Sequence, residues 1–150
     1  PSIDTQYVDV KYYQNINYPK SGSVSGVPLA IALDVINTNT LWVATTNGVA
    51  RSIDYGMSWN SYSFSGGTST NCKCILVDPN NTINVMSGSE DGLYRSTDGG
   101  SSWTRIRSGL GNLKTITSLT QAAGAAGQRR KVWVGTSSGV FIGKQSLSLE

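Results

Sequence analysis

Apolar residues along this chain occur in short runs separated by turn residues. The run at 72–77 ends at the turn sequence Asp-Pro-Asn-Asn of 78–81, and similar runs follow at 85–89, 93–96 and 103–107. The runs are rich in β-branched residues, and no window of comparable length has the period of about 3.6 residues that a helix requires. The pattern therefore predicts four short antiparallel strands in this part of the chain.

The same pattern occurs once earlier in the chain, at an offset of 44 residues. Sliding residues 30–59 onto 74–103 without a gap gives eleven identities in 30 positions. The earlier strands are expected at 29–33, 41–45, 49–52 and 59–64. A fixed period of about 40–50 residues indicates a repeat architecture, and four antiparallel strands per period are typical of a β-propeller blade.

A third, shorter unit follows the second. Its strands are expected at 115–120, 132–136 and 138–141, with a longer loop at 121–131 and no fourth strand of its own. All three units carry a small residue at the fourth place of the second strand, and these residues are Ala44, Gly88 and Gly135. A small residue at this place indicates close approach of another part of the backbone.

The sequence thus predicts an all-β fold made of β-propeller blades, in three four-stranded antiparallel units of which the third must obtain its fourth strand elsewhere. The units span about 29–64, 72–108 and 115–143, within a single domain covering 1–150. Propellers close with about four to eight blades, so three units leave two open flanks. We expect completion to six blades, either by dimerisation or within a longer parent chain.

An additional strand is expected near the start of the chain. Residues 7–13 read Tyr-Val-Asp-Val-Lys-Tyr-Tyr, which has strand composition, and a polar loop separates them from the first unit. This strand could complete the third unit of its own chain or that of a neighbour. We favour an oligomer in which the strand is exchanged.

An eight-residue motif is the most conspicuous element of the repeat. Ser-Ile-Asp-Tyr-Gly-Met-Ser-Trp at 52–59 recurs as Ser-Thr-Asp-Gly-Gly-Ser-Ser-Trp at 96–103. A serine and an aspartate two places apart can bond backbone N–H groups of one turn, glycine can take a positive φ, and tryptophan can bury a large ring between units. We predict structural roles for Ser52, Asp54, Gly56, Trp59, Ser96, Asp98, Gly100 and Trp103.

The motif resembles the Asp box of sialidase-like propellers (the BNR repeat), whose pattern is Ser/Thr-x-Asp-x-Gly-x-x-Trp. Both copies match at every defined position, and the three units together cover roughly residues 29–143. The resemblance implies that the loops fasten the third strand of a blade to the fourth, away from the ligand face. It implies no single function, because sialidases, xyloglucan hydrolases, sorting receptors and photosystem assembly factors all contain this box.

The chain offers few groups for catalysis. It has no histidine and nine carboxylates, of which Asp34 and Asp78 occupy equivalent strand-end turns. The carboxylates left without a structural role are Asp4, Asp9, Glu90 and Asp91. A glycosidase needs two carboxylates about 5–10 Å apart across one bond, and the adjacent pair at 90–91 does not supply them. The sialidase set of three arginines, a Tyr/Glu pair and an aspartate cannot be transferred onto this sequence either. We expect a chain that is not an enzyme and that uses no cofactor and no metal.

Cys72 and Cys74 are separated by a single residue on a predicted strand. We expect both on the same face of that strand, as buried free thiols, because a bridge between them would need distorted geometry. Without histidine or further cysteine the pair cannot complete a zinc site. Asn80 begins a glycosylation sequon on a turn, which matters only in a host that glycosylates.

Composition narrows the setting in which the protein acts. Charged residues make up 14%, and Ser, Thr, Asn and Gly together account for 63 of 150 residues, as in many extracellular, cell-surface or virion proteins. The net charge of +3 without a clustered basic face does not indicate nucleic-acid binding, and no apolar run is long enough for a membrane span.

The leading functional hypothesis is a non-catalytic recognition or structural module, with a carbohydrate or a protein as its ligand. Tyr12, Tyr18 and Tyr62 could stack on sugar rings, although packing within strands explains them equally well. The alternative is a fragment of a larger Asp-box glycoside hydrolase, sialidase- or xyloglucanase-like, whose catalytic carboxylates lie outside these 150 residues.

Overall fold

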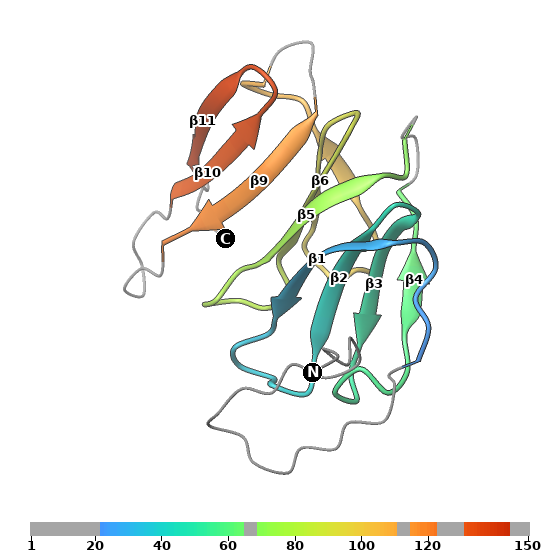
Figure 1. Ribbon diagram of the computed structural model, residues 1–150. Coiled ribbons are helices and arrows are strands. Elements are labelled where there is room, and N and C mark those ends of the chain that lie inside the picture. The colour runs from blue at the N-terminus through green and yellow to red at the C-terminus, as the bar shows by residue number, and fades with distance from the viewer. Residues whose placement is uncertain (1–21, 65–68, 111–114, 123–130, 145–150) are drawn as a thin grey trace, which may run out of the picture.

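The computed structural model describes residues 22–64, 69–110, 115–122 and 131–144. Within these ranges the chain forms three antiparallel sheets, which lie side by side with the second between the other two (Figure 1). The described ranges contain strands and turns and no α-helix, which confirms the all-β prediction. Accordingly, they include no helix that could cross a bilayer.

We call the three sheets blades 1, 2 and 3. Blade 1 has the order β1 (Pro28–Leu33), β2 (Leu41–Thr45), β3 (Gly48–Ser52) and β4 (Asn60–Tyr62). Blade 2 has the order β5 (Cys72–Val77), β6 (Val85–Ser89), β7 (Leu93–Ser96) and β8 (Thr104–Ile106). The strands lie within one or two residues of the predicted ones, because strong turn residues mark their ends.

Blade 3 is a three-stranded sheet in the described part of the chain. It consists of β9 (Ile116–Gln121), β10 (Lys131–Thr136) and β11 (Gly139–Lys144), with β10 in the middle. The outer edge of β11, which corresponds to the edge where β4 and β8 pair in the other blades, has no strand beside it among these residues. The strand expected at 7–13 lies outside the described residues.

Strand register relates the blades residue by residue. Val49 pairs with Tyr62 in blade 1, and Leu93 pairs with Ile106 in blade 2, so the offset of 44 residues holds in space. In the second and third strands, the pair Ala44–Val49 recurs as Gly88–Leu93 and as Gly135–Val140. Residues of different blades can therefore be compared as structural equivalents.

Each pair of neighbouring blades shares one apolar core. Blades 1 and 2 enclose an aromatic cluster in which Trp42 meets Trp103 edge-on at 6.1 Å and Phe64 stacks on Tyr94 at 4.1 Å. Blades 2 and 3 enclose an aliphatic cluster instead, formed by residues such as Leu93, Ile116, Val132 and Val134. The face-to-face packing of blades thus supplies most of the buried apolar area, as expected for a stack of sheets that cannot bury their faces alone.

The small residues of the second strands lie where neighbouring chain segments come close. A Cβ added at Gly88 would lie 2.6 Å from the sulfur of Cys74 and 2.7 Å from Cβ of Ile116, and a Cβ at Gly135 would collide with the Ser118 hydroxyl. Ala44 is fully buried. The neighbours that come close at Gly88 and Gly135 are side chains, so the predicted approach of another part of the backbone was wrong at these two positions.

The two cysteines correct one prediction. Both are buried free thiols as expected, but Cys72 packs in the core shared with blade 1 whereas Cys74 packs in the core shared with blade 3. The pairing of β5 with β6 shifts register between these residues, since Cys72 pairs with Ser89 and Cys74 with Gly88. This β-bulge breaks the two-residue alternation, so the prediction of a common face was wrong.

Candidate functional site

The first motif loop is held by its own side chains. The hydroxyl of Ser52 accepts the N–H of Gly56 at 2.8 Å and donates to the carboxylate of Asp54 at 2.7 Å. The same carboxylate accepts both the N–H and the hydroxyl of Ser58, at 2.8 and 2.5 Å. Gly56 has φ of 88°, which a residue with a side chain rarely adopts.

The second loop repeats this network at 96–103. Ser96 accepts the N–H of Gly100 at 2.8 Å and donates to Asp98, which accepts the N–H and hydroxyl of Ser102 at 2.9 and 2.6 Å. Hydrogen bonds lower the pKa of Asp54 and Asp98 to about 2. The largest contributions come from the hydroxyl and N–H of the serine four residues after each aspartate, and the next comes from the hydroxyl of the serine two residues before it. These carboxylates are therefore ionised at neutral pH and occupied by their own turns.

The motif tryptophans lie in different surroundings. Trp103 is buried between blades 1 and 2, and its indole N–H donates to the carbonyl of Gly100 at 3.1 Å. Trp59 is only half-buried, and the described residues offer its indole N–H no acceptor. Trp103 of blade 2 faces the preceding blade, which is blade 1. Trp59 is the equivalent residue of blade 1, and the described part of the chain has no blade before blade 1.

The carboxylates of the other candidates are engaged within blade 2. Glu90 lies 3.1 Å from the ammonium of Lys73 and accepts the amide of Asn71 at 2.8 Å. Asp91 accepts the hydroxyls of Ser89 at 2.5 Å and Tyr94 at 3.0 Å. Burial and this bond to Asp91 raise the pKa of Tyr94 to about 12.

The other described residues singled out in the sequence lie in turns or within strand packing. Asp34 accepts the N–H groups of Ile36 and Asn37, and Asp78 accepts that of Asn80, so both cap strand-end turns. The described residues bring no three His, Cys, Asp or Glu side chains together as a metal site would require. Tyr62 packs half-buried against Trp42 at 6.0 Å, which favours the packing interpretation over sugar stacking. The remaining candidates lie outside the described residues, and they are Asp4, Asp9, Tyr12 and Tyr18.

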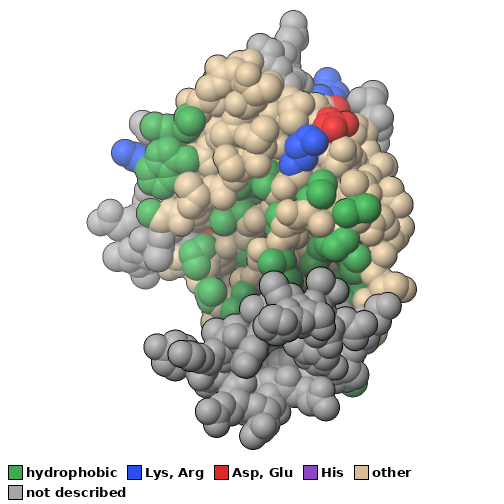
Figure 2. Space-filling view, in the orientation of Figure 1, with side chains coloured by type: hydrophobic (Ala, Val, Ile, Leu, Met, Phe, Trp, Pro, Cys, Tyr) green, Lys and Arg blue, Asp and Glu red, His purple; other side chains and the backbone are tan. Residues whose placement is uncertain are grey.

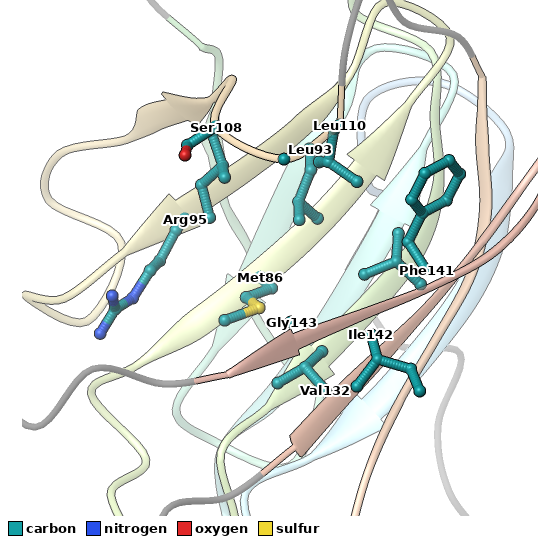
Figure 3. A pocket seen from close by; sticks show the side chains of 12 residues that line it. Met86, Leu93, Arg95, Ser108, Leu110, Val132, Phe141, Ile142 and Gly143 are labelled. Atoms are coloured by element: carbon teal, nitrogen blue, oxygen red, sulfur yellow. The ribbon is translucent and has the colours of Figure 1, made fainter.

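A cavity of about 540 Å³ lies between blades 2 and 3. Met86 and Leu93 line it from blade 2, Val132 and Phe141 line it from blade 3, and Arg95 reaches its rim (Figure 3). Sequence reasoning missed this cavity. The available signal was that Met86 and Ser108 of the second unit stand where the first unit has the aromatic residues Trp42 and Phe64.

On the outer face of blade 1, the side chains of the edge strand β1 are apolar and exposed, whereas Val43 and Ala50, which share that face on the inner strands, are 5% and 1% exposed. Leu29, Ile31 and Leu33 point away from blade 2 with exposed fractions of 46%, 66% and 47%. Figure 2 shows apolar side chains with few charged groups over the part of the surface where β1 lies. The equivalents of Ile31 and Leu33 in blade 2 are Ile75 and Val77, which blade 1 covers to 8% and 7% exposure.

The outer face of blade 3 has the same character. Val140 and Ile142 are 72% and 60% exposed, and half-buried Trp133 lies beside Ile142 in the ladder. The equivalents of Val140 in the other blades, Val49 and Leu93, are only 1% and 4% exposed. Both flanks therefore present side chains that are buried wherever the described chain supplies a neighbouring blade.

Comparison with known proteins identifies the fold. No protein-family model matches the sequence, and no curated protein matches it either. Solved structures do match. YCF48 from Cyanidioschyzon merolae aligns at TM-score 0.59 and 21% identity, over 83% of this chain and 38% of that one.

Two glycoside hydrolases align similarly. The GH74 enzyme of Niastella koreensis gives TM-score 0.57 and 20% identity over 82% of this chain, and an ancestral GH74 enzyme gives 0.52 and 21% over the same share. The chain spans 23% and 20% of their lengths. These proteins are β-propellers. The likeness, like the three sheets themselves, shows that the chain has the β-propeller blade fold.

Proposed function

We propose that this chain is a non-catalytic β-propeller module that acts in recognition or structural assembly, and that its two flanks are completed by packing against further blades. One observation carries the proposal. Ile31, Leu33 and Val140 are about half exposed or more, whereas their equivalents at the two interior blade contacts are buried. Apolar patches of this kind mark protein contacts.

The proposal for assembly is a two-fold dimer. If blade 3 of each copy packs on blade 1 of the other, two identical contacts close a ring of six blades, and no flank remains open. Trp133 and Val140 would then meet the face of β1, as Trp42 and Val49 meet blade 2 in the described chain. Trp59 would be buried in the way that Trp103 is.

The motif loops support the non-catalytic part of the proposal. We interpret them as Asp boxes in which Asp54 and Asp98 fasten turns rather than react, since their oxygens are filled by serine hydroxyls and N–H groups. Glu90 and Asp91 are likewise paired within their own blade. A glycan or protein ligand on an extracellular, cell-surface or virion protein fits the composition and remains part of this proposal.

A second candidate is a segment of a larger glycoside hydrolase of the GH74 type. The likeness to two GH74 enzymes favours it, because this chain matches only 20–23% of their length and the missing blades would then come from the same polypeptide. Assays of the purified chain on xyloglucan and on sialosides address catalysis directly. We expect no release of reducing sugar or sialic acid, and sustained turnover would contradict the non-catalytic proposal.

Sedimentation velocity on flank variants tests the contact. Ile31→Asp places a charge in the proposed interface and should give monomers, whereas Ile83→Asp, at a turn residue of similar exposure (52%), should leave the dimer intact. Equal dimer fractions for both variants, with unchanged melting temperatures, would show that the β1 face takes no part in association.

A further inference from the structure

The cavity between blades 2 and 3 occupies a position that, in the equivalent contact between blades 1 and 2, is filled by side chains. The offset of 44 residues replaces Trp42 by Met86 and Phe64 by Ser108, so large rings give way to smaller side chains. In the filled contact, Trp103 lies 6.1 Å from Trp42 and 5.0 Å from Phe64. The described part of blade 3 has no residue equivalent to Trp103.

The missing residue has a defined place. Trp103 immediately precedes β8, and the pairing of Thr104 with Arg95 sets it beside Ser96 at the end of β7. In blade 3 the equivalent of Ser96 is Gly143 on β11, and Gly143 lines the cavity (Figure 3). A fourth strand paired with β11 would therefore direct a side chain into the cavity.

Arg95 at the rim is the equivalent of Arg51 in blade 1. Its equivalent Arg51 donates to the carbonyl of Gly99, in the loop that leads to Trp103, at 3.2 Å. For Arg95 the described residues provide one acceptor, the amide oxygen of Asn84 at 3.5 Å. In blade 3 the position equivalent to Gly99 is residue 146, which lies outside the described residues, so the acceptor indicated for Arg95 belongs to the stretch that follows β11.

We propose that the β11 edge and this cavity, together called the acceptor groove, receive residues 7–13 of a second copy as the fourth strand of blade 3. This inference rests on the proposed function. Alternation along the segment places Val8, Val10 and Tyr12 on one apolar face, which suits a groove lined by Met86 and Phe141. Main-chain bonds to β11 and side-chain burial in the cavity hold the strand.

The position of Gly22 beside blade 1 favours the second copy over the same chain. The N–H of Gly22 donates to the carbonyl of Met57 at 3.2 Å, beside the outer loop of blade 1, and blade 2 separates this point from blade 3. In the six-bladed dimer, blade 1 of one copy adjoins blade 3 of the other.

Disulfide trapping tests the exchange in the full chain. Val10→Cys and Ser108→Cys are prepared separately, mixed, and oxidised mildly at neutral pH. Cys72 and Cys74 remain inert because burial raises the pKa of both thiols to about 11. We expect a covalent dimer in the mixture, and at least tenfold less with Ser61→Cys, an exposed residue on β4, in place of Ser108→Cys.

The outcomes separate the two proposals. A doubly substituted chain that forms its disulfide within one monomer would overturn exchange between copies. A dimer by light scattering that gives no Val10–Ser108 disulfide would overturn the strand as occupant while leaving the dimer intact. A monomer by light scattering would overturn both the dimer and the exchange.

Discussion

At the scale of single residues, the two motif loops show how one aspartate can organise a turn. Asp98 accepts the N–H and hydroxyl of Ser102 and the hydroxyl of Ser96, so its carboxylate stands in for missing backbone partners. Charge-assisted bonds of this kind hold the carboxylate in its ionised form, which is why its pKa falls. We interpret this role as maintenance of the turn, since both carboxylate oxygens accept bonds within it.

The lowered pKa predicts how stability depends on pH. The pKa of Asp98 is about 2 in the fold and 3.8 ordinarily, so its contribution is fully present above about pH 4 and is lost as pH falls through 2. Thermal melts of Asp98→Asn should therefore show a lower melting temperature at pH 7 and a shallower decline toward pH 2 than the parent. Glu90→Gln serves as the control. Parallel pH profiles for Asp98→Asn and parent would contradict this assignment.

The two tryptophans predict unequal losses. Trp103→Ala removes a buried ring from the aromatic cluster and should cost about 3–5 kcal/mol in the free energy of unfolding. Trp59→Ala should cost clearly less in the monomer, because its ring is only half-buried on the open flank. Urea unfolding at low protein concentration measures both. Equal losses would mean that the flank is covered within the monomer.

At the scale of elements, the strands were predictable because turn residues and the 44-residue offset mark their ends. The sheet faces on which Cys72 and Cys74 lie could not be predicted, because the bulge in β5 depends on its pairing with β6. The cavity was missed for a related reason. The cavity arises because Met86 and Ser108 stand where the first unit has large aromatic rings. Only the packing between blades shows that these two positions line the same cavity.

The close approach of blades 2 and 3 predicts that Gly88 tolerates no side chain. Gly88→Ala would place Cβ against the sulfur of Cys74 and against the side chain of Ile116, so packed side chains must shift, at a cost of about 1–3 kcal/mol. Gly143→Ala, where Cβ meets nothing nearer than the carbonyl of Val132 at 3.7 Å, is the matched control when both variants are measured in the monomeric Ile31→Asp background, in which the acceptor groove is empty. A melting temperature of Gly88→Ala equal to that of the control would show that the interface yields easily.

At the scale of the whole molecule, the fold followed from the repeat but the assembly did not. The sequence shows three units and hence two open flanks, and the exposed fractions of Ile31 and Val140, set against their buried equivalents, support the proposal that both flanks are contact surfaces. The dimer is favoured because its two contacts are identical and close the ring.

Static light scattering on the purified chain tests this central claim most directly. The account predicts a mass of about 32 kDa, twice the chain mass of 16.0 kDa, that persists on dilution to low micromolar concentration. A folded, soluble species of 16.0 kDa with a cooperative melting transition would contradict it.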